Sequence, residues 1–385
     1  MLELLFLLLP VAAAYGWFMG RNSVRSEERK EQQRFSKQYA TGLNLLLSDQ
    51  SDKAVDLFVE LLDVDSETLE THWTLGKLFR RRGEVERAIK IHQNLTSRPN
   101  IAEHDRLTAM FELGKDYLAA GIYDRAEQMF SGLQQHKAFR ARSRKNLLEL
   151  FQATHEWDKA IKVALRLSKE QAGVEPVIAQ LYCQLAELDV GAEAAIKHYK
   201  KALKHDTRCV RASIALGHLY ARQMNYPQAV SNYQRVLQQD KVLVCEVLEP
   251  LEQVYSAMGD TLPYVEFLQD CVAEDAGTSA VITLSEYIFQ TQGGQAAERF
   301  LRKNMVNHPT MRGFRQLMDF HIRAADVGNA RESLKILQSM VAEHISQRPK
   351  YCCRHCGFAG HTLYWQCPSC KSWNTTKPII GLDGE

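Results

Sequence analysis

A recurring glycine constrains the fold of this chain more than any other sequence feature. The spacing is 34 residues from Gly42 to Gly76 and 38 from Gly76 to Gly114, and the same pattern returns at Gly217. An alanine follows each glycine by twelve positions, and a bulky residue follows the alanine by four. The sets are Gly42, Ala54 and Phe58; Gly76, Ala88 and His92; Gly114, Ala126 and Phe130; and Gly217, Ala229 and Tyr233. Such a period predicts pairs of antiparallel helices that cross at small residues and must stack to bury their apolar faces.

The repeat resembles the tetratricopeptide pattern, with Leu113-Gly114-x-x-Tyr117 and Leu216-Gly217-x-x-Tyr220 among its best matches. We predict an all-α superhelical solenoid over residues 35–346, with about nine units, the last three irregular. The aromatic residues are expected to fill the space between neighbouring units. In solenoids of this kind, partners usually bind the concave face formed by the first helices.

The first residues predict a membrane anchor. The residues from Leu2 to Met19 are apolar apart from Glu3. A helix of this length can cross a bilayer. A cleaved secretory signal is the alternative, but no basic residue precedes the run. Basic residues follow it, at Arg21, Arg25, Arg29 and Lys30. We therefore assign residues 1–20 to a transmembrane helix and 21–34 to a juxtamembrane linker, with the N-terminus periplasmic and the body cytoplasmic.

Charge and cysteine content limit the classes of function. A net charge of +2 over 385 residues lacks the basic excess of nucleic-acid binders. The nine cysteines are an odd number and widely spread, which does not indicate a disulfide framework and favours a reducing compartment. The sequence has no Gly-rich phosphate loop, no His-Glu-x-x-His and no nucleophile elbow, so we do not expect an enzyme.

Residues 347–385 predict a metal module. Two Cys-x-x-Cys pairs, Cys353 with Cys356 and Cys367 with Cys370, can place four thiolates around zinc or a single iron. Gly357 follows the first pair and permits the positive φ of a metal knuckle, whereas Lys371 occupies that position after the second. Five aromatic residues are expected to form a miniature core: Tyr351, Phe358, Tyr364, Trp365 and Trp373.

Neighbouring residues of ligand type are not expected to bind the metal. Cys352 does not fit the Cys-x-x-Cys register, and four cysteines already fill a tetrahedral site without His355 or His361. We expect the module to pack against the last helices, either as a staple or as a docking surface. An iron-based redox sensor is the alternative, because a four-thiolate iron can change charge by one electron.

The chain combines a predicted anchor, a repeat array and a metal module in that order. Its last residues are Lys377-Pro-Ile-Ile-Gly-Leu-Asp-Gly-Glu385. Over its full length the chain resembles the bacterial lipopolysaccharide assembly protein B family, also called YciM. The resemblance implies a non-catalytic adaptor in the inner membrane of Gram-negative bacteria. It would regulate lipopolysaccharide synthesis by promoting proteolysis of the deacetylase LpxC by the membrane protease FtsH. It also implies rubredoxin-like iron binding by Cys353, Cys356, Cys367 and Cys370.

Two other interpretations remain open. A generic membrane-tethered tetratricopeptide scaffold for envelope assembly complexes has the same architecture, and so does a metal-sensing or redox-sensing adaptor. The knuckle around Cys367 and Cys370 also resembles the zinc motif of the RadA repair proteins, but without a phosphate loop or basic excess that resemblance is local. Partners implied by the family are FtsH, LpxC and lipopolysaccharide assembly proteins, and a homo-oligomer is compatible with the sequence.

Overall fold

The computed structural model describes residues 69–99, 101–306 and 308–385, and before them residues 17, 19, 40–42, 44–45, 53 and 57. The predicted anchor, residues 1–20, lies outside the described residues apart from Trp17 and Met19, and the linker 21–34 lies outside them entirely. Among the described residues, no helix has the length and apolar character needed to cross a membrane. The chain divides into two compact units, Met1–Leu150 and Phe151–Glu385.

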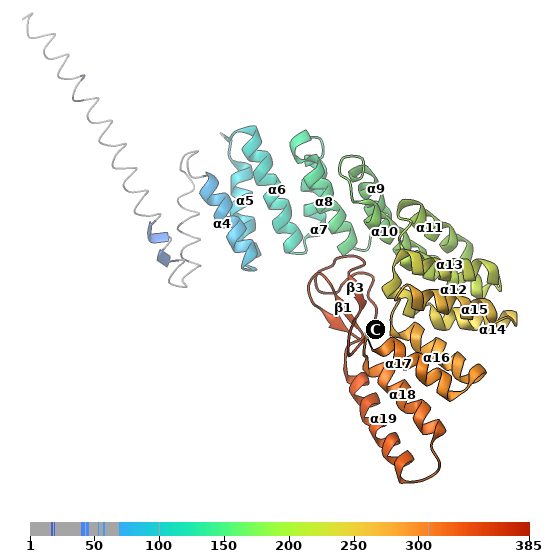
Figure 1. The fold of residues 1–385 in the computed structure, drawn as a ribbon. Helices are drawn as coiled ribbons and strands as arrows, with labels where there is room; N and C mark the ends of the chain where they lie inside the picture. Colours follow the sequence, from blue (N-terminus) through green and yellow to red (C-terminus); the bar gives the residue numbers. More distant parts are fainter. Residues whose placement is uncertain are drawn as a thin grey trace, which may run out of the picture. The chain divides into compact units, whose positions relative to one another are not determined.

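Antiparallel helix pairs fill the described part of the first unit (Figure 1). Its helices are α4 (Leu69–Arg81), α5 (Val85–Ser97), α6 (Glu103–Ala119), α7 (Tyr123–Leu133) and the greater part of α8 (Lys137–Ala153). Most of the repeat expected around Gly42 lies outside the described residues. Gly76 and Gly114 lie on α4 and α6, the first helices of their pairs, as the repeat predicts.

The second unit continues the all-α repeat array and ends in the small cysteine module (Figure 1). Its helices are α9 (Trp157–Leu167), α10 (Glu175–Leu188), α11 (Ala192–His205), α12 (Val210–Arg222), α13 (Tyr226–Gln239), the short 3-10 helix η3 (Lys241–Glu246), α14 (Leu248–Met258), α15 (Leu262–Ala273), α16 (Thr278–Gln292), α17 (Gly294–Met305), α18 (Met311–Ala324) and α19 (Asn329–Gln347). One buried core, from Ala179 on α10 to Leu284 on α16, runs through its central helices.

The module after α19 contains a three-stranded antiparallel sheet in the order β2-β1-β3. Its strands are β1 (Tyr351–Cys353), β2 (Ala359–Gly360) and β3 (Thr376–Pro378). The central strand pairs Tyr351 with Gly360 on one side and with Pro378 on the other. The sheet therefore brings the start and the end of the cysteine segment together.

Three glycines of the repeat lie against the bulky residue sixteen positions later. The pairs are Gly76 with His92, Gly114 with Phe130, and Gly217 with Tyr233. A Cβ atom added to Gly114 would stand 2.8 Å from Phe130 Cε1, closer than real atoms approach. These rings therefore pack against the first helix of their own unit, while His92 also reaches Asp116 in the next unit. The packing against the first helix is possible because the glycine there leaves room for a flat side chain from the second helix.

A buried polar network joins the units of α4–α5 and α6–α7. Arg80 donates to Asp116 Oδ1 and to Glu112 Oε2, both at 2.6 Å, and His92 hydrogen-bonds the other oxygen of Asp116. His92 and Asp116 are fully buried. Burial would raise the pKa of Glu112, but the hydrogen bond from Arg80 and the nearby lysines lower it below its usual value. Arg80 thus does more than complement a helix C-terminus, since it links two repeats.

The close contact between Gly114 and Phe130 predicts opposite effects on stability for two glycine-to-alanine changes in the first unit. Gly114→Ala should lower the free energy of unfolding by about 1–3 kcal/mol, because the methyl group overpacks against Phe130. Gly132→Ala, on α7 where a new methyl group would meet no atom within 4 Å, should stabilise by about 0.5–1 kcal/mol through backbone entropy. Urea unfolding followed by circular dichroism measures both. If Gly114→Ala is neutral or stabilising, the proposed close packing of Gly114 against Phe130 is wrong.

Candidate metal centre

Four cysteine sulfurs converge in the C-terminal module. The Sγ atoms of Cys353, Cys356, Cys367 and Cys370 all lie within 4.8 Å of one another. Cys353 and Cys370 are 3.8 Å apart, and Cys356 and Cys367 are 3.6 Å apart. A tetrahedral ion with metal–sulfur bonds of about 2.3 Å has sulfur–sulfur edges of about 3.8 Å. The sulfurs therefore already stand at the corners that such an ion needs.

The two knuckles have the same backbone pattern. Gly357 N donates to Cys353 O and Lys371 N donates to Cys367 O, each at 2.9 Å. The residue after each second cysteine adopts a positive φ, 79° at Gly357 and 57° at Lys371. Glycine takes that conformation freely, whereas a lysine is strained there by about 1 kcal/mol. Lys371 therefore keeps the knuckle geometry despite its departure from the usual residue.

Hydrogen bonds set the protonation of the sulfurs. The Thr375 hydroxyl and the amides of His355 and Cys356 lower the pKa of Cys353 to about 7. Contacts with the side chain and amide of Ser372 lower the pKa of Cys370 to about 5. Burial raises the pKa of Cys367 to about 11, against the amides of its own knuckle. The site thus favours thiolates at two corners before any cation arrives, as a metal site requires.

The donor set fits zinc or iron and leaves no open position for a substrate. Soft thiolate ligands in a tetrahedron select these ions, and four protein ligands close the site. Among the described residues the cluster contains only the four predicted cysteines. Cys352 Sγ contacts the carbonyl oxygens of Cys353 and Gly357 instead. His355 lies close enough to lower the pKa of Cys370, and His361 is exposed.

The module binds the solenoid of its own unit through contacts that the sequence did not predict. Trp373 Nε1 donates to Gln152 Oε1 at 2.7 Å, and the Arg211 guanidinium lies 6.0 Å from the Trp373 ring centroid. Lys377 Nζ pairs with Asp240 Oδ2 at 2.8 Å. No local spacing could have revealed these contacts, because Trp373 and Gln152 are 221 positions apart.

Two further contacts complete this side of the module. Tyr351 donates to Glu246 Oε1 on η3 at 2.6 Å, and burial together with this carboxylate raises the pKa of Tyr351. Leu363 and Trp365 pack against the solenoid core. Trp365 and Trp373 therefore contact the solenoid, whereas Phe358 and Tyr364 of the predicted miniature core meet edge to face inside the module.

The tail fixes the module to later helices. Glu385 accepts hydrogen bonds from Ser279 N at 2.8 Å and Ser279 Oγ at 2.6 Å, and it pairs with Arg312. Leu382 O accepts from Met311 N at 2.7 Å. The predicted packing against the last helices is thus only part of the contact, which extends from α8 through α12 and η3 to α16 and α18.

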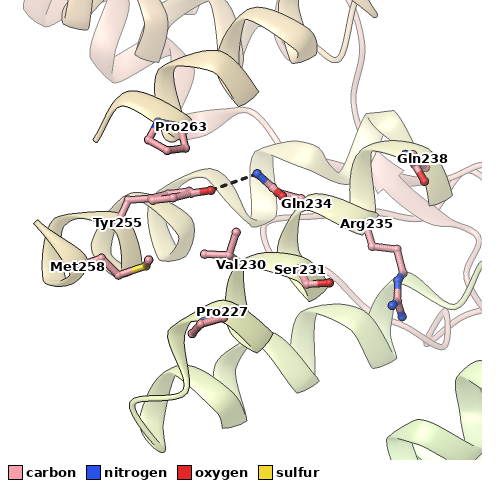
Figure 2. A pocket seen from close by; sticks show the side chains of 9 residues that line it. All are labelled: Pro227, Val230, Ser231, Gln234, Arg235, Gln238, Tyr255, Met258 and Pro263. Atoms are coloured by element: carbon pink, nitrogen blue, oxygen red, sulfur yellow. Dashed lines mark hydrogen bonds between the residues drawn. The ribbon is translucent and has the colours of Figure 1, made fainter. Parts of the chain in front are cut away.

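A shallow groove lies elsewhere on the second unit, away from the cysteine module. Figure 2 shows it between α13, α14 and α15, with a volume of about 600 Å³. Gln234 Nε2 donates to the Tyr255 hydroxyl across it, and Arg235 is its charged lining residue. Its lining includes no carboxylate, histidine or cysteine.

Among the cysteines outside the module, Cys183, Cys209 and Cys271 are buried and Cys245 is half-buried. A hydrogen bond with Cys183 lowers the pKa of Cys209, whereas burial raises the pKa of Cys183 well above its usual value. Burial raises the pKa of Cys271 to about 12 and also raises that of Cys245. Thiols held in the neutral form are poor nucleophiles and poor metal ligands.

Comparison with known proteins matches both parts of the chain. A family described as rubredoxin metal binding domain matches residues 351–378, and one described as tetratricopeptide repeat matches residues 191–241. Lipopolysaccharide assembly protein B of Escherichia coli strain K12 is 47% identical over 100% of both chains. The protein of that name from Haemophilus influenzae is 37% identical over 98% of each. A solved tetratricopeptide repeat protein from Parabacteroides merdae is 15% identical and covers 72% of this chain and 100% of its own, with a TM-score of 0.34.

Two adjacent cysteines provide a matched test of the ligand set. Cys353→Ser should abolish stable metal binding and unfold the module, because metal binding and folding are coupled in so small a domain. Cys352→Ser should keep both, since its sulfur lies outside the cluster. Metal content per chain, measured by mass spectrometry of the purified proteins, distinguishes them. Equal metal content in the two variants would contradict the assignment.

Proposed function

Because the chain belongs to the lipopolysaccharide assembly protein B family, we propose that it is a non-catalytic adaptor in lipopolysaccharide assembly. The observation that carries this proposal is identity of 47% over the whole of both chains, array and module included. A closed four-thiolate site and a repeat array fit an adaptor, since neither supplies a position where substrate can react. The array supplies a long surface for protein partners instead.

The adaptor acts at the membrane. Residues 1–20 anchor it in the bacterial inner membrane as a single span, on the strength of the apolar run and the basic residues that follow. Its N-terminus is periplasmic and its body cytoplasmic, where a reducing environment keeps the thiols available for metal. Anchoring places the array close to membrane-bound partners and so raises their effective concentration.

Its role in lipopolysaccharide synthesis is regulatory. By its resemblance to the family, the chain promotes degradation of the deacetylase LpxC by the membrane protease FtsH. Residues 35–346 supply the surface that brings protease and substrate together, and residues 347–385 form the metal module. Cys353, Cys356, Cys367 and Cys370 hold one iron ion, with zinc as the alternative, because both ions accept four tetrahedral thiolates.

The half-life of LpxC after depletion of this protein tests the regulatory role. We expect LpxC to become markedly longer-lived and lipopolysaccharide to accumulate, since the adaptor no longer delivers the enzyme to FtsH. A pulse-chase measurement with and without depletion provides the result. An unchanged half-life, together with crosslinking of the anchored protein to other envelope proteins, would favour a generic tetratricopeptide scaffold.

Removal of residues 1–20 tests the anchor separately. The truncated protein should remain folded, because the helices from α4 onward and the cysteine module lie outside that segment. It should nevertheless fail to restore normal LpxC turnover, because its local concentration at the membrane is lost. Fractionation and the LpxC half-life are measured side by side, with an unrelated transmembrane helix fused to the truncated chain as control. Full activity of the soluble form would show that anchoring is incidental.

A further inference from the structure

One short segment of the module contacts both a metal-ligand cysteine and the solenoid. Residues 373–377, which we call the coupling segment, begin with Trp373 and end with Lys377. At its ends the segment is tied to the solenoid, by Trp373 to Gln152 and by Lys377 to Asp240. The Lys377 side chain is only 8% exposed, so its ion pair is largely removed from water. A partly buried pair of this kind resists displacement more than a surface pair does.

Between these ends the segment reaches the metal-ligand sulfurs. Thr375 Oγ1 lies 3.2 Å from Cys353 Sγ and 3.3 Å from the carbonyl oxygen of Ser372. Its hydroxyl has a single proton. That proton can be donated either to the sulfur or to the Ser372 carbonyl oxygen, since both lie within reach of the same hydroxyl. The amide of Arg354 donates to Thr375 O at 2.9 Å and fixes the backbone at this point.

We propose that the metal centre includes this coupling segment, so that docking on the solenoid and retention of the metal reinforce each other. Thr375 is a positioning residue that holds the Cys353 thiolate toward the ion. Docking through Trp373 and Lys377 keeps Thr375 in place. Because coupling between two binding events is reciprocal, a loaded site must also hold the module more firmly on the solenoid. The proposal rests on the metal site proposed above and deepens it.

The magnitude follows from the behaviour of outer-shell groups. Partners that orient metal ligands by hydrogen bonding typically change metal affinity by about 10–100-fold when they are removed. Thr375 is such a partner by direct contact, and Asp240 acts on it through Lys377. A solenoid residue with no contact to the metal ligands should therefore alter how fast the ion leaves.

Two aspartates provide a matched test on the solenoid side. Asp240 and Asp260 each accept a hydrogen bond from the amide two residues later at 3.2 Å, through Oδ1. Among the described residues, only Asp240 of this pair forms an ion pair with the module. Asparagine can replace either as a cap acceptor. Asp240→Asn should accelerate zinc release about tenfold, whereas Asp260→Asn should leave the rate unchanged.

The experiment uses the full-length protein in detergent, loaded with zinc, and follows transfer of the ion to a chromogenic chelator. Thr375→Val should also accelerate release about tenfold, and Thr375→Ser, which keeps a hydroxyl, should restore the wild-type rate. Thr362→Val on the exposed part of the module serves as control. With cobalt in place of zinc, Thr375→Val should shift the sulfur-to-metal charge-transfer band, which a merely structural change in folding would not do.

Hydrogen exchange tests the reciprocal effect. Removal of the metal from the wild-type protein should increase exchange in peptides that contain Gln152 and Arg211, on the solenoid side of the contact. If both Asp240→Asn and Thr375→Val bind one zinc per chain and release it at the wild-type rate, the proposed coupling is wrong, although the metal site stands. A wild-type protein that binds no zinc would overturn the metal site itself, and the coupling with it.

Discussion

The close approach of two helices at a glycine is the constraint on which the solenoid depends. At Gly114 the space normally filled by a side chain is filled by the ring of Phe130, and Gly217 receives Tyr233 in the same way. This contact fixes the distance between the helices of a pair, because any residue larger than glycine at that position would force the helices apart. Once each pair has this spacing, successive pairs can stack at a regular interval. The surfaces that hold the cysteine module follow from that stacking.

The amino-acid sequence predicted the parts of this protein that depend on regular spacing. The glycine–alanine interval located the helix pairs, and the two Cys-x-x-Cys pairs located the four sulfurs that converge. The placement of the module on the solenoid was not predictable, because it depends on single contacts such as Trp373 with Gln152, which share no periodic pattern. The role of Trp365 was missed for the same reason, since an aromatic residue in a small module suits its own core equally well.

The helices of the second unit and the cysteine module are therefore parts of one folded unit. Leu363 and Trp365 bury apolar surface against the helices, while Glu385 closes the contact at Ser279 and Arg312. A module this small has little core of its own, so the metal and the solenoid both contribute to its stability. The module in turn covers part of the first helices α12, α16 and α18, which in a repeat array are the usual surface for partners.

The network of Arg80, His92 and Asp116 has a consequence for the evolution of the array. Repeats with the same pattern are often treated as interchangeable modules that duplicate and recombine. Here the second helix of one repeat supplies His92 and the first helix of the next supplies Asp116, both fully buried. A shuffled neighbour without that carboxylate would leave the buried His92 without this hydrogen bond and would leave Arg80 with Glu112 alone, which is destabilising. The buried contact therefore restricts which repeat can follow the one that contains Arg80 and His92.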